Sequence, residues 1–233
     1  MKKVIATTMA AFLVAQVASA VSATVDFASA YVFRGATFND GFVVQPGIEG
    51  EVAGYTVGAW ANIDISDPVD ANNSAVSEID LYIGKGLGTV AGWDVSAGLC
   101  QYTYPGADSL AEGTSDGETE LSITASGSLG GIDLSVGAYG DIDESSTPSY
   151  YEVSTGGSTV VAGLALDYGI TAGYSVDADA NEDDKLTSGF GYAAYSVSYD
   201  TGGGSLSVTY VDGLDDDVVD VAESVVFAYG ISL

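Results

Sequence analysis

The chain has 233 residues, in which 33 acidic side chains face only 5 basic ones, so its formal charge at neutral pH is −28. This charge excludes binding to the phosphate backbone of a nucleic acid, and a hydrophobic content of 47% excludes a disordered chain. The lack of histidine excludes a Ser-His-Asp triad, an imidazole zinc site and a histidine pH switch, and the single cysteine, Cys100, excludes an internal disulfide.

Residues 1–20 have the pattern of a secretory signal peptide. Two lysines follow the first methionine, residues 4–17 are apolar, and Ala18-Ser19-Ala20 is a small-x-small cleavage site. We expect cleavage after Ala20, with Val21-Ser22-Ala23 as a second candidate site. An uncleaved membrane anchor is the alternative, although the apolar stretch is short for a bilayer span. The pattern predicts an exported protein with a single mature domain over residues 21–233.

Beyond the signal peptide, apolar and polar residues alternate with a period of two, which is typical of strands that have one apolar face. Between Leu164 and Val176 every second residue is apolar, and the residues between them are polar or small. No segment of the mature chain has the periodicity of an amphipathic helix. In chain order the sequence predicts about twelve strands, over residues 24–38, 42–52, 55–64, 76–87, 93–104, 117–126, 131–142, 149–161, 164–177, 186–199, 204–212 and 220–233.

The predicted connections alternate between short and long ones. The first, Asn39-Asp40-Gly41, has the composition of a tight hairpin turn. The short connections cover residues 53–54, 88–92, 127–130, 162–163 and 201–203, and the long acidic ones cover 65–75, 105–116, 143–148, 178–185 and 213–219. This alternation is typical of outer-membrane barrels, which have short periplasmic turns, long external loops and an even number of strands.

A bilayer offers the backbone no hydrogen-bonding partners, so strands cross it only as a closed sheet with one face toward lipid and the other toward the lumen. Tyr55 and Trp93 begin strands after short turns, where an interfacial aromatic belt would lie. We therefore expect an all-β fold, a transmembrane antiparallel up-and-down β-barrel of the outer-membrane type with about twelve strands. A soluble β-sandwich with core aromatics is the alternative.

Short motifs in the first half of the chain resemble those of the bacterial TorF-family porins. In order, they are Tyr31-Val32-Phe33-Arg34-Gly35, Asn39-Asp40-Gly41, Gln45-Pro46-Gly47, Gly58-Ala59-Trp60-Ala61-Asn62, Glu78-Ile79-Asp80-Leu81-Tyr82 and Tyr102-Thr103-Tyr104-Pro105-Gly106. The resemblance covers the mature chain and implies an outer-membrane β-barrel with a channel role, but it supplies no catalytic residues. The chain departs from the family pattern at its last residue, Leu233, where barrel-assembly signals usually have Phe, and in its larger excess of acids.

If the apolar faces point toward lipid, nine carboxylates and one arginine project into the lumen. These pore-lining candidates are Asp26, Arg34, Glu78, Asp80, Asp94, Glu118, Glu120, Asp133, Asp167 and Asp177. A carboxylate-lined pore concentrates cations and excludes anions, so we expect a preference for cations. The same inward set includes Trp60, Tyr82, Tyr102 and Tyr139, which narrow the bore. An open aqueous conduit and an interior filled by side chains are both compatible with the pattern.

Arg34 is the only arginine in the chain and shares its predicted strand face with Asp26. A guanidinium in an acidic lumen is expected to form bidentate pairs with carboxylates. Its role is then either a structural tie between neighbouring strands or a selectivity filter.

The acidic loops raise the question of calcium. Asp177-Ala178-Asp179-Ala180-Asn181 has the opening spacing of an EF-hand loop, but Glu182 replaces the turn glycine and Ser188 replaces the bidentate glutamate, which excludes that motif. Loose binding of Ca²⁺ or Mg²⁺ by Asp183-Asp184 or Asp215-Asp216-Asp217 and a merely solvated acidic surface are the two alternatives. We expect no cofactor and no specific metal centre.

Three functional classes follow for a protein of the bacterial outer membrane. The first is a channel for passive diffusion of small solutes that prefers cations. The second is a closed structural or surface-interaction barrel whose acidic external loops bind divalent cations or lipopolysaccharide. The third, an outer-membrane enzyme, is disfavoured because the chain has no histidine and no lysine placed as a base. The sequence carries no signal for an oligomeric state.

Overall fold

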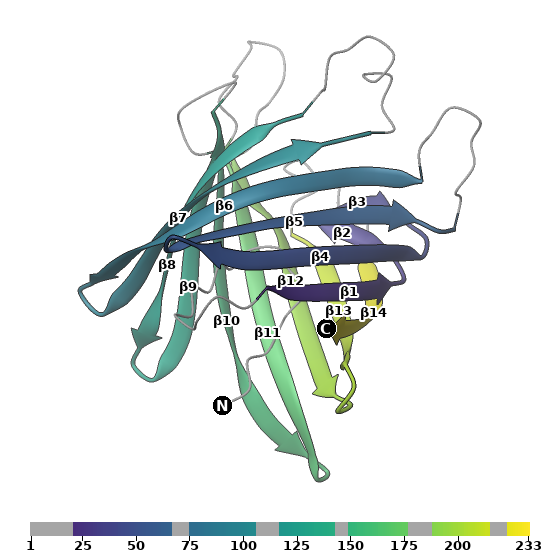
Figure 1. Cartoon of the computed structure of the whole chain (residues 1–233). Helices are drawn as coiled ribbons and strands as arrows, with labels where there is room; N and C mark the ends of the chain where they lie inside the picture. The colour runs from purple at the N-terminus through teal and green to yellow at the C-terminus, as the bar shows by residue number, and fades with distance from the viewer. Residues whose placement is uncertain (1–20, 67–74, 106–116, 143–148, 177–187, 215–222) are drawn as a thin grey trace.

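The computed structural model describes residues 21–66, 75–105, 117–142, 149–176, 188–214 and 223–233. In these residues twelve strands form one closed antiparallel barrel, in which each strand pairs with its neighbours in the chain and β1 closes the ring against β14 and β4 (Figure 1). The barrel strands are β1 (Ser22–Ala28), β4 (Val43–Val52), β5 (Tyr55–Asp64), β6 (Val76–Val90), β7 (Trp93–Thr103), β8 (Thr119–Leu129), β9 (Ile132–Asp141), β10 (Tyr150–Val161), β11 (Leu164–Ser175), β12 (Gly189–Asp200), β13 (Ser205–Gly213) and β14 (Ser224–Ser232). The predicted all-β barrel and its strand number are confirmed.

Tight turns join the strands at one end of the barrel. Ala53-Gly54, Ala91-Gly92 and Ala162-Gly163 each have two consecutive positive φ angles, the geometry of a two-residue hairpin turn that matches the twist of its strands. Gly130-Gly131 has the same geometry and lies at the same end. At the other end the strands stop farther apart in sequence, as between Asp64 and Val76 or between Ser175 and Gly189, so the predicted alternation of short and long connections is confirmed. Among the described residues, no helix is long and apolar enough to span a membrane.

The two faces of the barrel wall differ in the way the alternation predicts. On β6, Ile79, Leu81 and Ile83 are 36%, 57% and 40% exposed and lie on the outer face. Glu78 and Asp80, which alternate with them, are 2% and 0% exposed and lie inside. The wall is therefore apolar outside and polar inside, the reverse of a soluble protein.

The predicted strand over residues 24–38 is wrong, because the chain leaves the wall after Ala28. It continues into a separate two-stranded sheet, β2 (Tyr31–Phe33) and β3 (Ala36–Asn39). The tight turn lies at Arg34-Gly35, where φ is 50° and 88°, and not at the predicted Asn39-Asp40-Gly41. A period of two describes any extended segment, so the pattern could not show that the chain folds back. We call residues 31–39 the inner hairpin.

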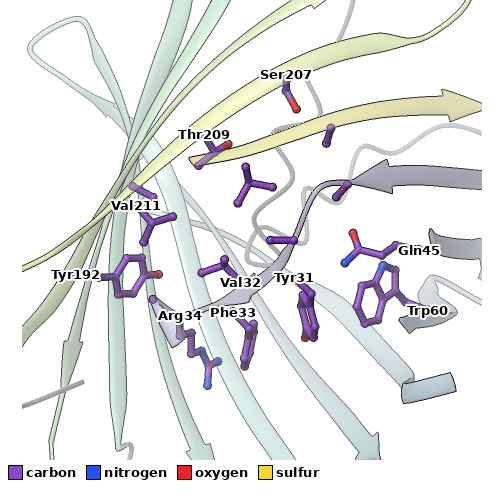
Figure 2. A pocket seen from close by; sticks show the side chains of 16 residues that line it. Tyr31, Val32, Phe33, Arg34, Gln45, Trp60, Tyr192, Ser207, Thr209 and Val211 are labelled. Atoms are coloured by element: carbon purple, nitrogen blue, oxygen red, sulfur yellow. The ribbon is translucent and has the colours of Figure 1, made fainter. Parts of the chain in front are cut away.

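The inner hairpin lies inside the barrel and forms its core. Two groups of buried side chains surround it, and Val32 packs on one while Phe33 packs on the other. One group consists of Tyr139, Tyr150, Tyr192, Ala194 and Val211, and the other of Ala28, Tyr31, Val43 and Ala228. Figure 2 shows Tyr31, Val32, Phe33 and Arg34 along the hairpin, with Tyr192 near the side of Arg34 and Trp60 near the side of Tyr31. Residues 31–39 of the chain therefore occupy part of the barrel interior.

Candidate functional site

The tip of the inner hairpin is bonded to the far wall of the barrel. Arg34 Nη1 donates to Glu120 Oε2 at 2.6 Å, and Arg34 Nη2 donates to Glu120 Oε1 at 2.8 Å. This is a bidentate pair of the kind predicted for Arg34, and its partner is on β8. The prediction that Arg34 shares a strand face with Asp26 is wrong, because Asp26 is on β1 whereas Arg34 lies in the turn of the inner hairpin. The pair thus ties the hairpin across the lumen and does not join neighbouring strands.

Aromatic rings enclose the guanidinium of Arg34. Its Cζ lies 4.7 Å from the ring centres of Phe33 and Tyr139 and 4.2 Å from that of Tyr150, within the range of cation–π attraction. Burial in this turn would by itself lower the pKa of Arg34, but the hydrogen bonds and the charge of Glu120 outweigh burial and raise that pKa above its ordinary value. Arg34 therefore stays charged, and its charge is already neutralised by Glu120.

Gly35 lets the hairpin tip approach β12. A Cβ added at Gly35 would lie 2.9 Å from Cβ of Tyr192, and the φ of +88° is a conformation that L side chains rarely adopt. No larger residue fits this turn without displacing Tyr192 or the hairpin.

We predict that Gly35→Ala lowers the free energy of unfolding by about 1–3 kcal/mol, since it adds both backbone strain and a contact with Tyr192. Gly54→Ala is the matched control, because its φ of +78° imposes similar strain while no atom lies within 4 Å of the added Cβ. Urea unfolding of both variants measures the difference. An equal loss in the two variants would show that the hairpin does not press against Tyr192.

A second carboxylate network lies beside the hairpin tip. Tyr150 and Tyr192 donate to Glu152 Oε2 at 3.1 and 3.3 Å, and their hydroxyls lie 2.8 Å apart. Glu152 is 8% exposed and was not among the predicted pore-lining residues. The alternation along β10 does indicate its position. Tyr151 and Val153, on either side of Glu152, are apolar and exposed on the outer face, so Glu152 points inward.

Amide side chains fix the base of the hairpin on the near wall. Asn62, fully buried on β5, donates from Nδ2 to Asn39 Oδ1 at 2.6 Å and to Ser77 Oγ at 2.7 Å. Asn62 Oδ1 accepts from Gln45 Nε2 at 3.0 Å, and Asn39 Nδ2 donates to Asp64 Oδ2 at 3.0 Å. Hydrogen bonds at the base and an ion pair at the tip therefore hold the hairpin at both ends. Sequence patterns give no sign of this network, since amides with these partners are far apart in the chain.

Four of the predicted pore-lining residues gather around the inner hairpin: Arg34, Glu78, Asp80 and Glu120. The others do not join them. Asp26 is half-buried on β1, Asp167 accepts a hydrogen bond from Ser158, and Asp94, Glu118 and Asp133 are exposed. Asp177 lies outside the described residues, as do Asp183-Asp184 and Asp215-Asp216-Asp217.

A small cavity separates the hairpin from the wall formed by β12, β13, β14 and β1. Its volume is about 90 Å³, room for a few water molecules. Ala28, Ala194, Ser207, Thr209, Val226 and Ala228 contribute small side chains to it (Figure 2). Among the described residues, no group of three or more Asp, Glu or Cys side chains is placed to hold a metal ion. The space between the hairpin and the wall is thus small on this side and lined largely by small side chains, whereas the buried side chains Glu78 and Asp80 make the side of β6 acidic.

The fold and site define a class: closed up-and-down β-barrels with an apolar exterior, an acidic interior and a hairpin folded into the lumen. The chain belongs to the family described as "Bacterial protein of unknown function (Gcw_chp)", whose profile matches residues 14–218. The likeness of its motifs to TorF-family porins stays a resemblance. No curated protein matches the sequence.

Two solved structures are similar over most of their length. The NanC porin in a rhombohedral crystal form has 9% sequence identity and a TM-score of 0.49, with 92% of this chain and 99% of that chain covered. The COG4313 outer membrane channel from Pseudomonas putida F1 has 13% identity and a TM-score of 0.48, with 94% and 97% covered. The family description assigns no function, so the function is argued from the barrel and its interior.

Proposed function

We propose that this protein is an outer-membrane channel for small solutes, with a preference for cations, whose lumen is narrowed by the inner hairpin. The proposal includes export by a cleaved signal peptide, lipid as the partner of the outer face, and no catalytic step. The observation that carries it is the distribution of exposed apolar side chains around a closed barrel.

Large apolar side chains are exposed on strands all around the ring. Leu81 on β6, Ile123 on β8 and Phe227 on β14 are 57%, 52% and 56% exposed. Soluble monomers rarely expose apolar patches larger than a few hundred Å². Near the tight turns, Tyr55 is exposed and Nζ of Lys85 lies 4.2 Å from the centre of its ring, which suits the boundary between lipid and water. A bilayer is the environment that covers such a surface.

The charge inside the barrel favours cations. Arg34 is the only arginine, and its charge is paired with Glu120, so it does not offset the remaining interior acids. Glu78, Asp80 and Glu152 are all buried and face the hairpin region. A low-dielectric passage lined by carboxylates raises the local concentration of cations. Anions would meet no unpaired positive side chain among the described lining residues.

The single cysteine allows a direct test of whether solutes reach the lumen and which sign of charge the lumen prefers. Cys100 is buried on the inner face of β7, opposite Tyr82 and Glu120 on the neighbouring strands. We predict that, in the folded protein in lipid vesicles, a cationic trimethylammonium-ethyl methanethiosulfonate modifies Cys100 severalfold faster than the anionic sulfonato-ethyl reagent, after each rate is divided by the rate of the same reagent with a free thiol in solution. Mass spectrometry follows the modification, and Cys100→Ser is the control for specificity. Faster labelling by the anion would contradict the cation preference.

A closed barrel that serves a structural or surface role is the second candidate, because the hairpin is bonded at both ends and its side chains pack into the buried core inside the barrel. The same experiment separates the two. If neither reagent reaches Cys100 until the protein is unfolded, the lumen is closed and the second candidate holds. The acidic loops that would bind divalent cations or lipopolysaccharide in that case lie outside the described residues.

A further inference from the structure

Two buried carboxylates lie two positions apart on β6, and both therefore point to the inner face of the barrel. Glu78 is 2% exposed and Asp80 is fully buried. Neither Oδ1 nor Oδ2 of Asp80 receives a hydrogen bond from any described residue. Its strand neighbours across the sheet are Trp60 on β5 and Tyr102 on β7. Burying a carboxylate in this way costs free energy unless a positive charge or hydrogen-bond donors compensate it.

The inner hairpin places a third oxygen at the same point. Tyr31 is 5% exposed, and its hydroxyl makes no hydrogen bond of standard geometry within the described part of the chain, although it lies close enough to Glu78 for a weak hydrogen-bonding interaction and also interacts electrostatically with Asp80. Its ring packs against Trp60, with ring centres 5.5 Å apart, which holds the hydroxyl in this position. The hairpin and the wall thus jointly enclose a pocket of oxygen atoms.

The side chains that face this pocket are acidic or phenolic. Glu120 interacts with Asp80 but is itself engaged by Arg34, so the nearby guanidinium is committed to another carboxylate. Tyr104 also interacts with Tyr31 and with Glu78. Two carboxylates without a basic partner and the phenol oxygen of Tyr31 form a donor set for a hard cation, which takes oxygen ligands. Since no group of three acidic ligands gathers among the described residues, water must supply the remaining ligands.

We propose that Glu78, Asp80 and Tyr31 bind a small inorganic cation that keeps part of its hydration shell. Its place in the path of permeating ions rests on the proposed channel function, whereas the binding itself does not. The cation would compensate the charge of Asp80 and would couple the seating of the hairpin to cation binding, because Tyr31 belongs to the hairpin and the carboxylates belong to the wall.

Thermal unfolding of the full chain in detergent tests the site without any need for conduction. Unfolding temperatures are compared in NaCl, CaCl₂ and choline chloride at equal ionic strength, since the quaternary ammonium of choline cannot be coordinated by oxygen ligands in the way that a hard metal cation is. We expect Na⁺ or Ca²⁺ to raise the unfolding temperature of the wild type above its value in choline, Asp80→Asn to lose that increment, and Asp133→Asn to keep it. Asp133 is exposed and provides the same loss of charge away from the pocket. A wild type that unfolds identically in all three salts, or an increment that survives in Asp80→Asn, would overturn the proposal.

Should Asp80→Asn fail to fold, Tyr31→Phe decides, because it removes one ligand and no charge. The cation concentration that gives half of the stabilisation is expected to rise severalfold in Tyr31→Phe, and an unchanged value rejects the site. Planar-bilayer recordings of the same preparations keep the two proposals apart. If cations stabilise the protein but no current flows, the channel proposal is contradicted and the cation site is supported. If current flows but stability does not depend on the cation, the cation site is rejected and the channel proposal is supported.

Discussion

Arg34→Ala is expected to lower the free energy of unfolding by about 2–4 kcal/mol, somewhat less than the cost of removing one partner of a fully buried ion pair, because the Arg34 and Glu120 side chains are 20% and 12% exposed. The variant leaves Glu120 unpaired inside the barrel and removes the contacts of the guanidinium with Phe33, Tyr139 and Tyr150. It also adds one net negative charge to the lumen, so the preference for cations should increase. Denaturant unfolding measures the first effect, and the reversal potential in a KCl gradient measures the second.

Lys85→Ala is the matched control, because it removes a cation from the outer face, where Lys85 contacts Tyr55. It should change the free energy of unfolding and the reversal potential little, since an exposed cation–π contact contributes about 0.5–1 kcal/mol. The double variant Arg34→Ala/Glu120→Ala should lose less stability than the sum of the two single variants, because it leaves no unpaired charge. Additive losses would mean that the pair does not tie the hairpin, and an unchanged reversal potential would reject Arg34 as a determinant of selectivity.

Removal of the inner hairpin is expected to raise the single-channel conductance severalfold. Ala28 and Val43 are register partners at the ends of β1 and β4, so an Asn-Gly turn can replace residues 29–42 and rejoin the two strands directly. The shortened chain keeps all twelve barrel strands and loses the segment that crosses the lumen. Planar-bilayer recordings of the wild type and the shortened protein measure the change.

The shortened barrel will be less stable, because the hairpin contributes Tyr31, Val32 and Phe33 to the buried core. Heat-dependent migration in detergent gels is the control that its wall is still closed. Gly35→Ala provides an intermediate case, in which the hairpin is present but loosened. If the closed, shortened barrel conducts no better than the wild type, the hairpin does not limit permeation.

The barrel could be predicted from sequence because the features that determine it involve residues close together in the chain. Each strand alternates apolar and polar residues, and that alternation assigns side chains to the two faces before any partner strand is known, as Ile79 and Leu81 against Glu78 and Asp80 show. Turn residues such as Ala53-Gly54 and Ala162-Gly163 mark the strand ends in the same local way. The order of strands then follows from their connection by hairpins.

The interior site could be predicted only in part. Parity placed Arg34, Glu78, Asp80 and Glu120 inside, but it could not show that Arg34 reaches Glu120, a partner 86 positions away in sequence. The alternation also turns Glu152 inward, between the exposed Tyr151 and Val153, although Glu152 was not among the predicted residues. It gives no sign that Asn62 joins a hydrogen-bond network, because the partners of Asn62 lie far apart from it in the chain.

The amino-acid sequence by itself determined that this chain is an acidic, all-β barrel with an apolar face outward, because alternation and turn chemistry act between residues that are close in the chain. The tertiary structure decided that residues 31–39 leave the wall and cross the lumen. That outcome depends on contacts with β5 through β10 and with β12, which exist only once the ring has closed and brought Arg34, Gly35 and Asn39 to their partners. A segment of alternating residues is compatible with a position in the barrel wall and with a position in the lumen. Packing inside the closed barrel favours the lumen for residues 31–39.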